Sequence, residues 1–587
     1  MKISTFAWLT FLLPGFCLDL FADDTPTAVQ VFNARYGKTA QETIQKLREF
    51  YRQKPDDWRT RYYLATVLIE QAQSESELRE ADLLLDGVEK VVEPNWLVPW
   101  SLARKYEIHA KRLESLLAQS QTQAIALQAE LARDRELRPT LSKTMASFET
   151  VLARLHQGLD APKTELTGDE VREDLYALKS LVASRWAYVE EKQRQTGRSL
   201  DVILATSLSQ VKPRMNMQEA SDLVRMFVSN LLDGHCVVEL PGAVPRRALP
   251  FKVQDTSHGL IVVETLPSAP FQVGDRWLEV EGVNAYSALS QQEQLAFGST
   301  LAGRRWNAVM ALPTRWHEDR SYRVIIERGG NILEFDSKPV PLETLPWLNF
   351  AYIASTERWL EHRMLSPNVG YLRISTWSPV DGDLTFSNSG PYIQKFCSQL
   401  DAVMAKLQKT EDLVLDLRGN GGGSDALCTW LASYFVSHPL KIYVLRYRQM
   451  EGLIRGDGFQ NPEHKATHYP QRSGQVVPAR LWVLVDSGCF SATDTFLNIL
   501  TRNIPDRVKI IGRNSNGGIG GPQMVGILRN TRAALTVSTC KAYAVSGELL
   551  EGKPVKVDVP VQWTRDDIIN GRDPDLEAAL TLIRKAN

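Results

Sequence analysis

The chain has 587 residues, of which 43% are hydrophobic and 23% are charged. At about 150 residues per domain this length predicts several domains, and the near-average composition excludes collagen, wholesale disorder and a polytopic membrane protein. Because 68 Lys and Arg residues stand against 69 Asp and Glu residues, the net charge is −1, and no global field would attract nucleic acid or anionic lipid. We therefore expect no nucleic-acid partner.

Residues 1–22 have the pattern of an export signal. Lys2 precedes an apolar stretch over residues 6–16, and two acidic residues follow Ala22, after which we expect cleavage. The stretch is too short, and too interrupted by Pro14, for a membrane span, and no later stretch of about 18 apolar residues exists. The mature protein is therefore predicted to be exported, either periplasmic or secreted, without a membrane span.

No cofactor or metal is predicted. Five cysteines lie outside the signal, and they lack both the C-x-x-C spacing of a zinc cage and the even count of a disulfide scaffold. The sequence leaves open whether one pair of them forms a disulfide in an oxidising compartment. His464 and His468 have a separation that could bind zinc, but Pro462 and Pro470 indicate a loop there.

Residues 23–155 predict an all-α N-terminal domain, because they are rich in Ala, Leu, Glu, Lys, Arg and Gln and poor in Gly. Apolar residues recur at helical spacing, as at Tyr63, Leu64 and Val67. The helix pairs weakly resemble tetratricopeptide arrays, without a clean repeat, and could bind a protein partner. Helical character continues over residues 156–240, which we predict as a helical subdomain.

Residues 241–342 predict a β module. Short alternating strands separated by Gly, Pro and Asp turns are expected at 260–263, 277–280, 322–326 and 332–335. The sequence VGDRWLEVEGV at 273–283 resembles the hairpin of PDZ domains, while an ordinary β-barrel hairpin with an aspartate turn remains the alternative. A PDZ-like module would bind an extended segment by strand addition.

Residues 343–587 predict an α/β core, in which strands alternate with amphipathic helices joined by right-handed crossovers. The expected strands are 369–374, 413–417 and 481–485, and the expected helices are 392–406, 424–436 and 492–500. Active sites in such sheets gather where strands end and helices begin. The chain as a whole is predicted to be a multidomain α+β protein.

Two of these strand ends carry the candidate chemistry. The strand at 413–417 runs into RGNGGG at 418–423, whose glycines let exposed N–H groups converge on an anion. An oxyanion hole suits this loop better than a phosphate loop, since no Gly-Lys-Ser or Gly-Lys-Thr follows. The strand at 481–485 leads to Ser491 at a helix start, where Ser491 and Asp494 could instead form a helix-capping pair.

These segments together resemble the C-terminal processing (tail-specific) peptidases. The residues LDLRGNGGG at 415–423 are similar to the family's DLR-x-N-x-GG motif, and FSATD at 490–494 resembles its nucleophile segment. GRDPDLEAAL at 571–580 resembles the family's closing helix. The resemblance covers residues 160–587 and leaves out the N-terminal helices.

The resemblance also selects a branch of the family. The bacterial C-terminal processing enzymes use a lysine base after the serine, but no lysine occurs here between Lys509 and Lys541. The branch that includes the tricorn core and the chlamydial secreted protease uses a histidine and a late glutamate. This chain has LLDGHCVV at 231–238 and LLEGKPVKVD at 549–558. The resemblance therefore implies a Ser-His-Glu triad rather than a Ser-Lys dyad.

The implied roles follow the chemistry of the side chains. His235 is the expected general base, Ser491 the nucleophile and Glu551 the carboxylate that orients the imidazole. The expected donors of the oxyanion hole are the N–H groups of Ala492 and of Gly421 or Gly422.

The predicted function is that of an exported serine endopeptidase acting on proteins or peptides, with Asp494 either supporting the site or only capping a helix. The alternative is a catalytically silent member that binds an apolar ligand or a peptide, or that acts as a scaffold. The joint presence of His235, Ser491, Glu551 and the glycine run favours the enzyme, because fold alone does not imply hydrolysis and a binding protein has no need of all four. Neither the oligomeric state nor the cleavage specificity follows from the sequence.

Overall fold

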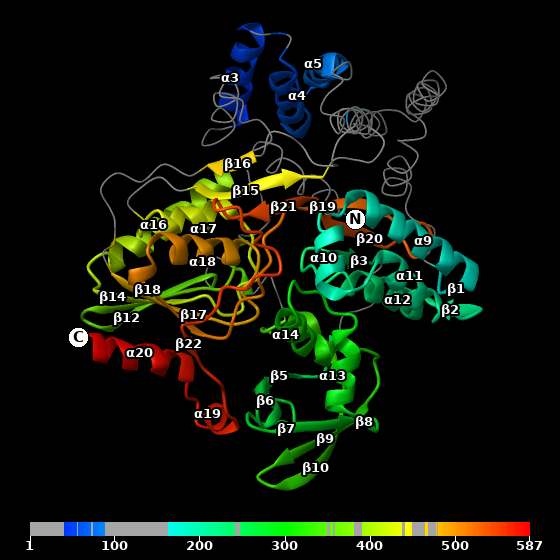
Figure 1. The fold of residues 1–587 in the computed structure, drawn as a ribbon, viewed down its shortest axis with the longest axis vertical. Helices are drawn as coiled ribbons and strands as arrows, with labels where there is room; N and C mark the ends of the chain where they lie inside the picture. Colours follow the sequence, from blue (N-terminus) through cyan, green and yellow to red (C-terminus); the bar gives the residue numbers. More distant parts are fainter. Residues whose placement is uncertain are drawn as a thin grey trace. The chain divides into compact units, whose positions relative to one another are not determined.

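The computed structural model describes residues 40–53, 55, 57–71, 74–88, 108, 163–240, 247–348, 353–355, 358–380, 390–436, 441–448, 464–467, 477 and 479–587. The chain forms two compact units, one of residues Cys17–Pro162 and Ser389–Gln394, and one of the remainder. Figure 1 shows the elements of both units. The predicted signal at 1–22 lies outside the described residues. Within the part that is described, no helix is both long and apolar enough to cross a membrane.

The described part of the N-terminal region is helical over residues 40–88, apart from short turns, as the composition predicts. Its described helices are α3 (Ala40–Gln53), α4 (Trp58–Gln71) and α5 (Glu75–Val88). They share one core that includes the fully buried Leu47, Leu64 and Leu85. Asp57 precedes α4 and accepts a hydrogen bond from the Thr60 N–H (3.2 Å), as expected of a residue that caps a helix.

Four helices form a subdomain before the β module: α9 (Gly168–Arg185), α10 (Val189–Thr196), α11 (Leu200–Leu208) and α12 (Met217–Ser229). Thr167 and Asn216 begin α9 and α12 with capping boxes, and β1 (Glu165–Thr167) pairs with β2 (Arg214–Asn216) just before these helices. The helices share their core with the hairpin of β19 (Pro522–Ile527) and β20 (Ala534–Ser538), which β3 (Val237–Glu239) extends to three strands. Segments far apart in the sequence therefore build one core.

The β module is an antiparallel sheet with the order β10–β9–β7–β6–β5. The four strands that the sequence predicts are β6 (Gly259–Thr265), β7 (Arg276–Val280), β9 (Tyr322–Arg328) and β10 (Asn331–Ser337), and β5 (Phe251–Thr256) is a fifth. Glu281 and Gly282 take positive φ values of 49° and 77° in the tight turn from β7 to β8 (Val283–Asn284). The module also contains α13 (Ala285–Glu293) and α14 (Leu301–Ala311), two helices that the sequence analysis did not predict.

The α/β core is a six-stranded sheet: β12 (Leu360–Ser366), β13 (Val369–Ile374), β14 (Asp412–Asp416), β17 (Arg480–Val485), β18 (Val508–Gly512) and β22 (Val559–Pro560), in that spatial order. Only β12 pairs antiparallel; the other neighbours are parallel. Its helices are α16 (Gly390–Leu407), α17 (Asp425–Ala432), α18 (Ala492–Asn503) and α20 (Pro574–Ala586). Figure 1 shows α16, α17 and α18 over one face of this sheet and α20 under the other, as the alternating pattern predicts.

A smaller sheet has the order β16–β15–β21. Its strands are β16 (His464–Thr467), β15 (Lys441–Tyr447) and β21 (Cys540–Tyr543). His464 therefore lies in a strand and the loop predicted there is wrong, because pairing with β15 outweighs the flanking prolines; His468 lies outside the described residues. The five cysteines that the structure describes are buried thiols, without a disulfide among them.

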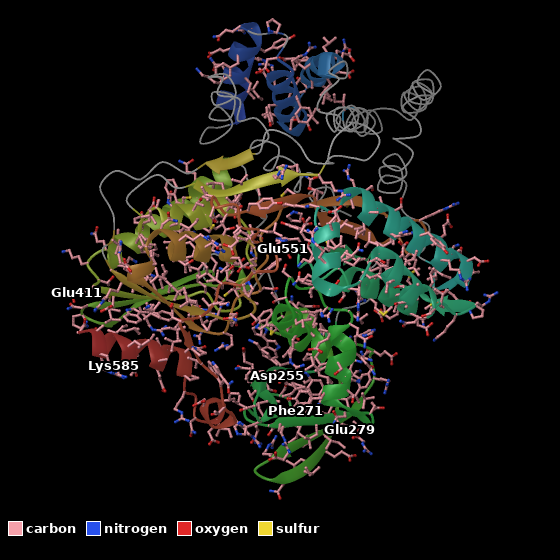
Figure 2. The ribbon with its side chains drawn as sticks, viewed as in Figure 1. Asp255, Phe271, Glu279, Glu411, Glu551 and Lys585 are labelled. Atoms are coloured by element: carbon pink, nitrogen blue, oxygen red, sulfur yellow. The ribbon has the colours of Figure 1, made fainter. Side chains whose placement is uncertain are left out.

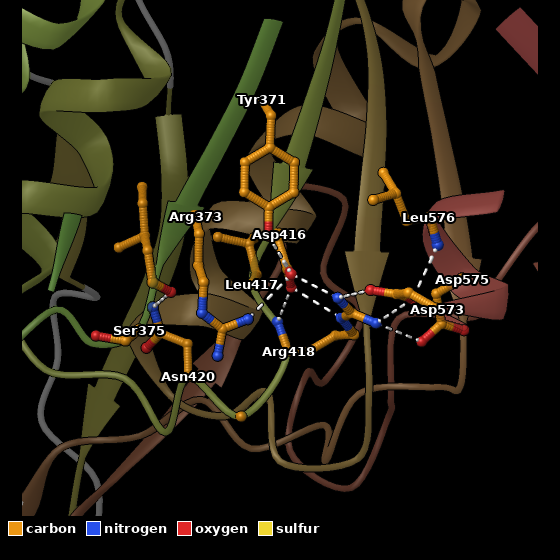
Figure 3. A network of polar contacts seen from close by, with 12 residues as sticks. Tyr371, Arg373, Ser375, Asp416, Leu417, Arg418, Asn420, Asp573, Asp575 and Leu576 are labelled. Carbon is orange, nitrogen blue, oxygen red and sulfur yellow. Dashed lines mark hydrogen bonds and ion pairs between the residues drawn. The ribbon is translucent and has the colours of Figure 1, made fainter. Parts of the chain in front are cut away.

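The DLR segment and the closing helix are joined by a network of ion pairs, shown in Figure 3. The Arg418 guanidinium donates to both carboxylate oxygens of Asp416 (2.9 and 2.6 Å) and to both of Asp573 (2.8 and 2.7 Å). Asp575, in α20, accepts from Arg418 and from Arg513. Although burial opposes it, the Arg418 guanidinium lowers the pKa of Asp416 to about 2. Arg418 thus fixes the strand end that leads into the glycine loop.

Candidate active site

Ser491 lies at the junction between a tight turn and α18, with an unusual backbone conformation. Its φ and ψ are 58° and −119°, a combination that non-glycine residues rarely adopt. Backbone strain of this kind is often found at functional sites. The Ser491 side chain makes no capping hydrogen bond to α18. Its Oγ lies instead 2.9 Å from Nε2 of His235, so the capping-pair alternative is wrong for this serine.

His235 reaches Ser491 from the loop between α12 and β3. Its backbone N–H donates to Asp233 Oδ1 (2.9 Å), and its ring lies against the Phe490 ring with the centroids 4.4 Å apart. Burial lowers the pKa of His235 to about 4, although the Asp233 carboxylate opposes this shift. The imidazole is therefore neutral at neutral pH and can accept a proton at Nε2. Among the described residues, His235 Nδ1 has no hydrogen-bond partner.

Glu551 is also buried beside the histidine. A carboxylate oxygen of Glu551, one of Asp233 and a ring nitrogen of His235 lie within 4.8 Å of one another. Glu551 Oε1 is 3.0 Å from Lys192 Nζ, and both side chains are almost fully buried. Burial raises the pKa of Glu551 to about 7, with Lys192 opposing the shift and Asp233 adding to it. Figure 2 shows Glu551 beside α10, the helix that carries Lys192.

Asp233, His235 and Glu551 form a group whose ligand atoms converge as they would on a metal ion. The Lys192 ammonium ion lies 3.0 Å from Glu551 and already neutralises this carboxylate. A divalent cation bound in the same space would be repelled by the ammonium ion. The donor set therefore suits a buried ion-pair cluster better than a metal centre.

The glycine loop lies directly against the nucleophile. A Cβ built on Gly422 would lie 2.6 Å from Ser491 Cβ and 3.0 Å from the Ala492 nitrogen. The Gly422 N–H donates to Asn420 Oδ1 (3.0 Å), whereas the Gly421 N–H makes no hydrogen bond to any residue that the structure describes. Of the two glycines considered as oxyanion donors, Gly421 is therefore the one whose N–H remains available for a substrate oxygen. Ala492 contributes the first N–H of α18, which has no partner within the helix.

Asp494 supports the nucleophile through the loop that follows β18. Its carboxylate accepts hydrogen bonds from the Gly517 and Gly518 N–H groups (3.0 Å each) and from the Ser515 hydroxyl. The Gly518 carbonyl in turn accepts the Ser491 N–H (3.0 Å). Burial raises the pKa of Asp494 to about 8, against these hydrogen bonds. Of the two roles predicted for Asp494, the contacts favour support of the site over capping.

A small pocket opens beside Ser491. It is lined by Asp425, Tyr443, Leu445, Thr495, Ile519 and Gly520. The Tyr443 hydroxyl donates to Asp425 Oδ2 (2.7 Å), so the carboxylate at the pocket wall is already engaged. The pocket combines apolar walls with hydroxyl groups.

Sequence reasoning missed two residues of this cluster. Lys192 lies in the charged helix VEEKQRQT, which reads as a solvated face, and no periodicity separates it from its exposed neighbours. Ser299 belongs to the β module, yet its hydroxyl accepts the Gly234 N–H (3.0 Å) and its carbonyl accepts Lys192 Nζ (3.3 Å). Only the fold brings these residues to His235.

Comparison with known families agrees with this geometry. Residues 368–561 match the model of peptidase family S41. The chain carries a peptidase family S41 domain. S41 is a serine peptidase family, so this is the domain of a serine peptidase. The matched segment contains Ser491, the glycine loop and Glu551, whereas His235 and Lys192 lie before it.

Solved structures share the fold around the S41 domain. The chain is similar to mature CPAF complexed with lactacystin, with 20% identity over 71% of this chain and 97% of that chain and a TM-score of 0.56. A second structure of mature CPAF matches at 20% identity over 68% of this chain and 94% of that chain, with a TM-score of 0.54. At this identity the similarity is one of fold.

Proposed function

We propose that the protein is an exported serine endopeptidase that cleaves proteins or peptides with Ser491 as nucleophile and His235 as general base. The observation that carries this proposal is the 2.9 Å distance between Ser491 Oγ and His235 Nε2, at a turn whose backbone is held at positive φ. An ordinary serine at a helix start would cap the helix, and this one does not.

The chemistry follows from the protonation state of His235. In the tautomer that carries its proton on Nδ1, the neutral imidazole takes the Ser491 proton at Nε2 as Oγ bonds to the substrate carbonyl carbon. The imidazolium then gives this proton to the leaving amine nitrogen, and the C–N bond breaks. Water, deprotonated by the same Nε2, hydrolyses the acyl-enzyme and restores Ser491.

Two backbone N–H groups would stabilise the tetrahedral intermediate. Those of Gly421 and Ala492 lie on the loop and the helix end that meet at Ser491, and each such donor is worth about 3 kcal/mol. Glu551, whose carboxylate lies within 4.8 Å of a ring nitrogen of His235 without a hydrogen bond to it, would stabilise the imidazolium that forms during the reaction.

The other parts of the chain have proposed roles that rest on sequence patterns. Residues 1–22 would direct export to the periplasm or the medium. The intact mass of the protein after expression in a secreting host would test the cleavage, because it should correspond to a chain that starts at Asp23. The module at 241–342 would act as a PDZ-like site for an extended substrate segment. If it does, substitutions along β5, a strand at one edge of the module's sheet, should lower the cleavage of long substrates and spare that of short peptides, because they leave Ser299 in place beside the histidine loop. The helices before residue 155 would bind a protein partner.

The proposed activity is tested by incubating the purified protein with an unfolded protein substrate and mapping the products by mass spectrometry. Ser491→Ala and His235→Ala should each abolish cleavage, because either change removes a reacting group. Ser487→Ala is the matched control, since the Ser487 hydroxyl donates to the Asn514 carbonyl outside the site. Well-folded wild type that cleaves no substrate would favour the binding-protein alternative, whereas cleavage that survives Ser491→Ala would refute Ser491 as the nucleophile.

A further inference from the structure

Lys192 is a buried lysine without a role in the proposed reaction. Its side chain is 3% exposed, and Nζ lies 3.0 Å from Glu551 Oε1 and donates to the Ser299 carbonyl (3.3 Å). Removing a lysine ammonium from water is costly unless it is paired, and a packed apolar residue would fill the same space at lower cost. A charge kept at this position, next to the general base, indicates that the charge has a use.

The formal charges around His235 show what that use is. Above the pKa of about 7 that Glu551 has beside Lys192, the Asp233 and Glu551 carboxylates and the Lys192 ammonium ion sum to −1 around a neutral imidazole. Uptake of the Ser491 proton by His235 brings the cluster to zero, which favours the state formed during reaction. Without Lys192 the resting charge would be −2, and two buried carboxylates beside an imidazole would bind a proton at rest.

The other titratable groups that face Glu551 do not supply this compensation. Burial raises the pKa values of Tyr188 and Cys236, and both stay neutral. Asp494, whose pKa burial raises to about 8, is a carboxyl group and supplies no positive charge in either protonation state. Among the described residues, Lys192 supplies the positive charge in contact with the group of Asp233, His235 and Glu551.

We propose that Lys192 is a positioning residue of this site: its ammonium ion holds Glu551 as a carboxylate and keeps the site free of a proton until Ser491 delivers one. The inference rests on the proposed function, because it assigns Lys192 a part in keeping His235 available as a base. It predicts that loss of the charge, with the fold intact, moves the acid limb of the reaction to higher pH.

The test is the pH dependence of Ser491 labelling by a fluorophosphonate, followed by mass spectrometry, in the full chain. Lys192→Gln removes the charge and retains an N–H donor for the Ser299 carbonyl; Lys192→Met is the second variant in case one of them misfolds. Each should shift the acid limb upward by about one pH unit or more, with labelling restored at higher pH. Lys192→Arg, which keeps the charge, should return the limb toward the wild-type position.

Lys541→Gln is the matched control. Lys541 Nζ pairs with Glu191 Oε1 (2.7 Å) on the same helix as Lys192 and is 8% exposed, but it does not contact Glu551. This variant should leave the acid limb in place. A Lys192→Gln limb that coincides with wild type, or that moves no further than the Lys541→Gln limb, would overturn the inference. Wild type that is not labelled at Ser491 would instead refute the proposed function itself.

Discussion

Gly422→Ala should impair both stability and catalysis, because the added methyl group would overlap the side chain of the nucleophile Ser491. Gly422 has φ = 101°, and its added Cβ would be 2.6 Å from Ser491 Cβ, where ordinary contact begins at 3.4 Å. Positive φ costs an L residue about 1–2 kcal/mol, and an extra methyl group in a filled site costs about 1–3 kcal/mol. The free energy of unfolding should therefore fall by about 2–5 kcal/mol.

The catalytic loss follows from the displacement that relieves the clash. The two segments must separate by 3.4 − 2.6 = 0.8 Å, and a displacement of about 1 Å in an active site costs about 100-fold in rate. Peptide-cleavage kinetics and urea unfolding would measure both effects. Gly197→Ala is the control: Gly197 has φ = 69° with no atom near its Cβ position, so it should lose about 1 kcal/mol and keep kcat/KM. Wild-type kcat/KM and stability in Gly422→Ala would refute this reasoning.

Three further predictions concern residues around the site. Arg418→Leu removes the guanidinium that joins Asp416 to Asp573, while Asp416 keeps Arg373, and should lower the free energy of unfolding by about 3 kcal/mol in urea titration; an unchanged midpoint would contradict the role of this network. Asp494→Ala removes the acceptor of two buried N–H groups, each worth about 1–3 kcal/mol, and should lower kcat/KM together with stability, whereas loss of stability alone would argue against support of the nucleophile. Since the pKa of His235 falls from its ordinary 6.5 to about 4, only the unfolded chain binds a proton there between these pH values, and stability drops as pH falls through this window. His235→Asn should lack this drop, worth up to about 3 kcal/mol, and parallel pH–stability curves would count against the burial of a neutral imidazole.

Ser491 and the glycine loop could be predicted together because they lie at adjacent strand ends. The glycine loop follows β14 and Ser491 follows β17, and these strands are parallel neighbours, so their carboxyl ends meet at one edge of the sheet. The histidine came from a family resemblance alone. No spacing rule connects His235 to Ser491, since the chain passes through the whole β module between them.

The environment of the pair could not be predicted. Lys192 follows two glutamates in a polar helix, and its burial results from the packing of α10 against residues 540–552, which are distant in sequence. The β module was read as a separate domain, yet α14 packs its Trp306 ring against Gly488, 2.5 Å from where a Cβ would lie, and Ser299 meets the histidine loop. Such contacts depend on tertiary packing that local sequence does not encode.

The central claim, an activated serine at position 491, is tested most directly by peptide-level mass spectrometry after exposure to a fluorophosphonate probe. The account predicts a single adduct on Ser491 that forms rapidly in wild type and is lost in His235→Ala, since Nε2 lies 2.9 Å from the serine oxygen. A folded protein that gains no adduct on Ser491, or that is labelled equally well without His235, would contradict it.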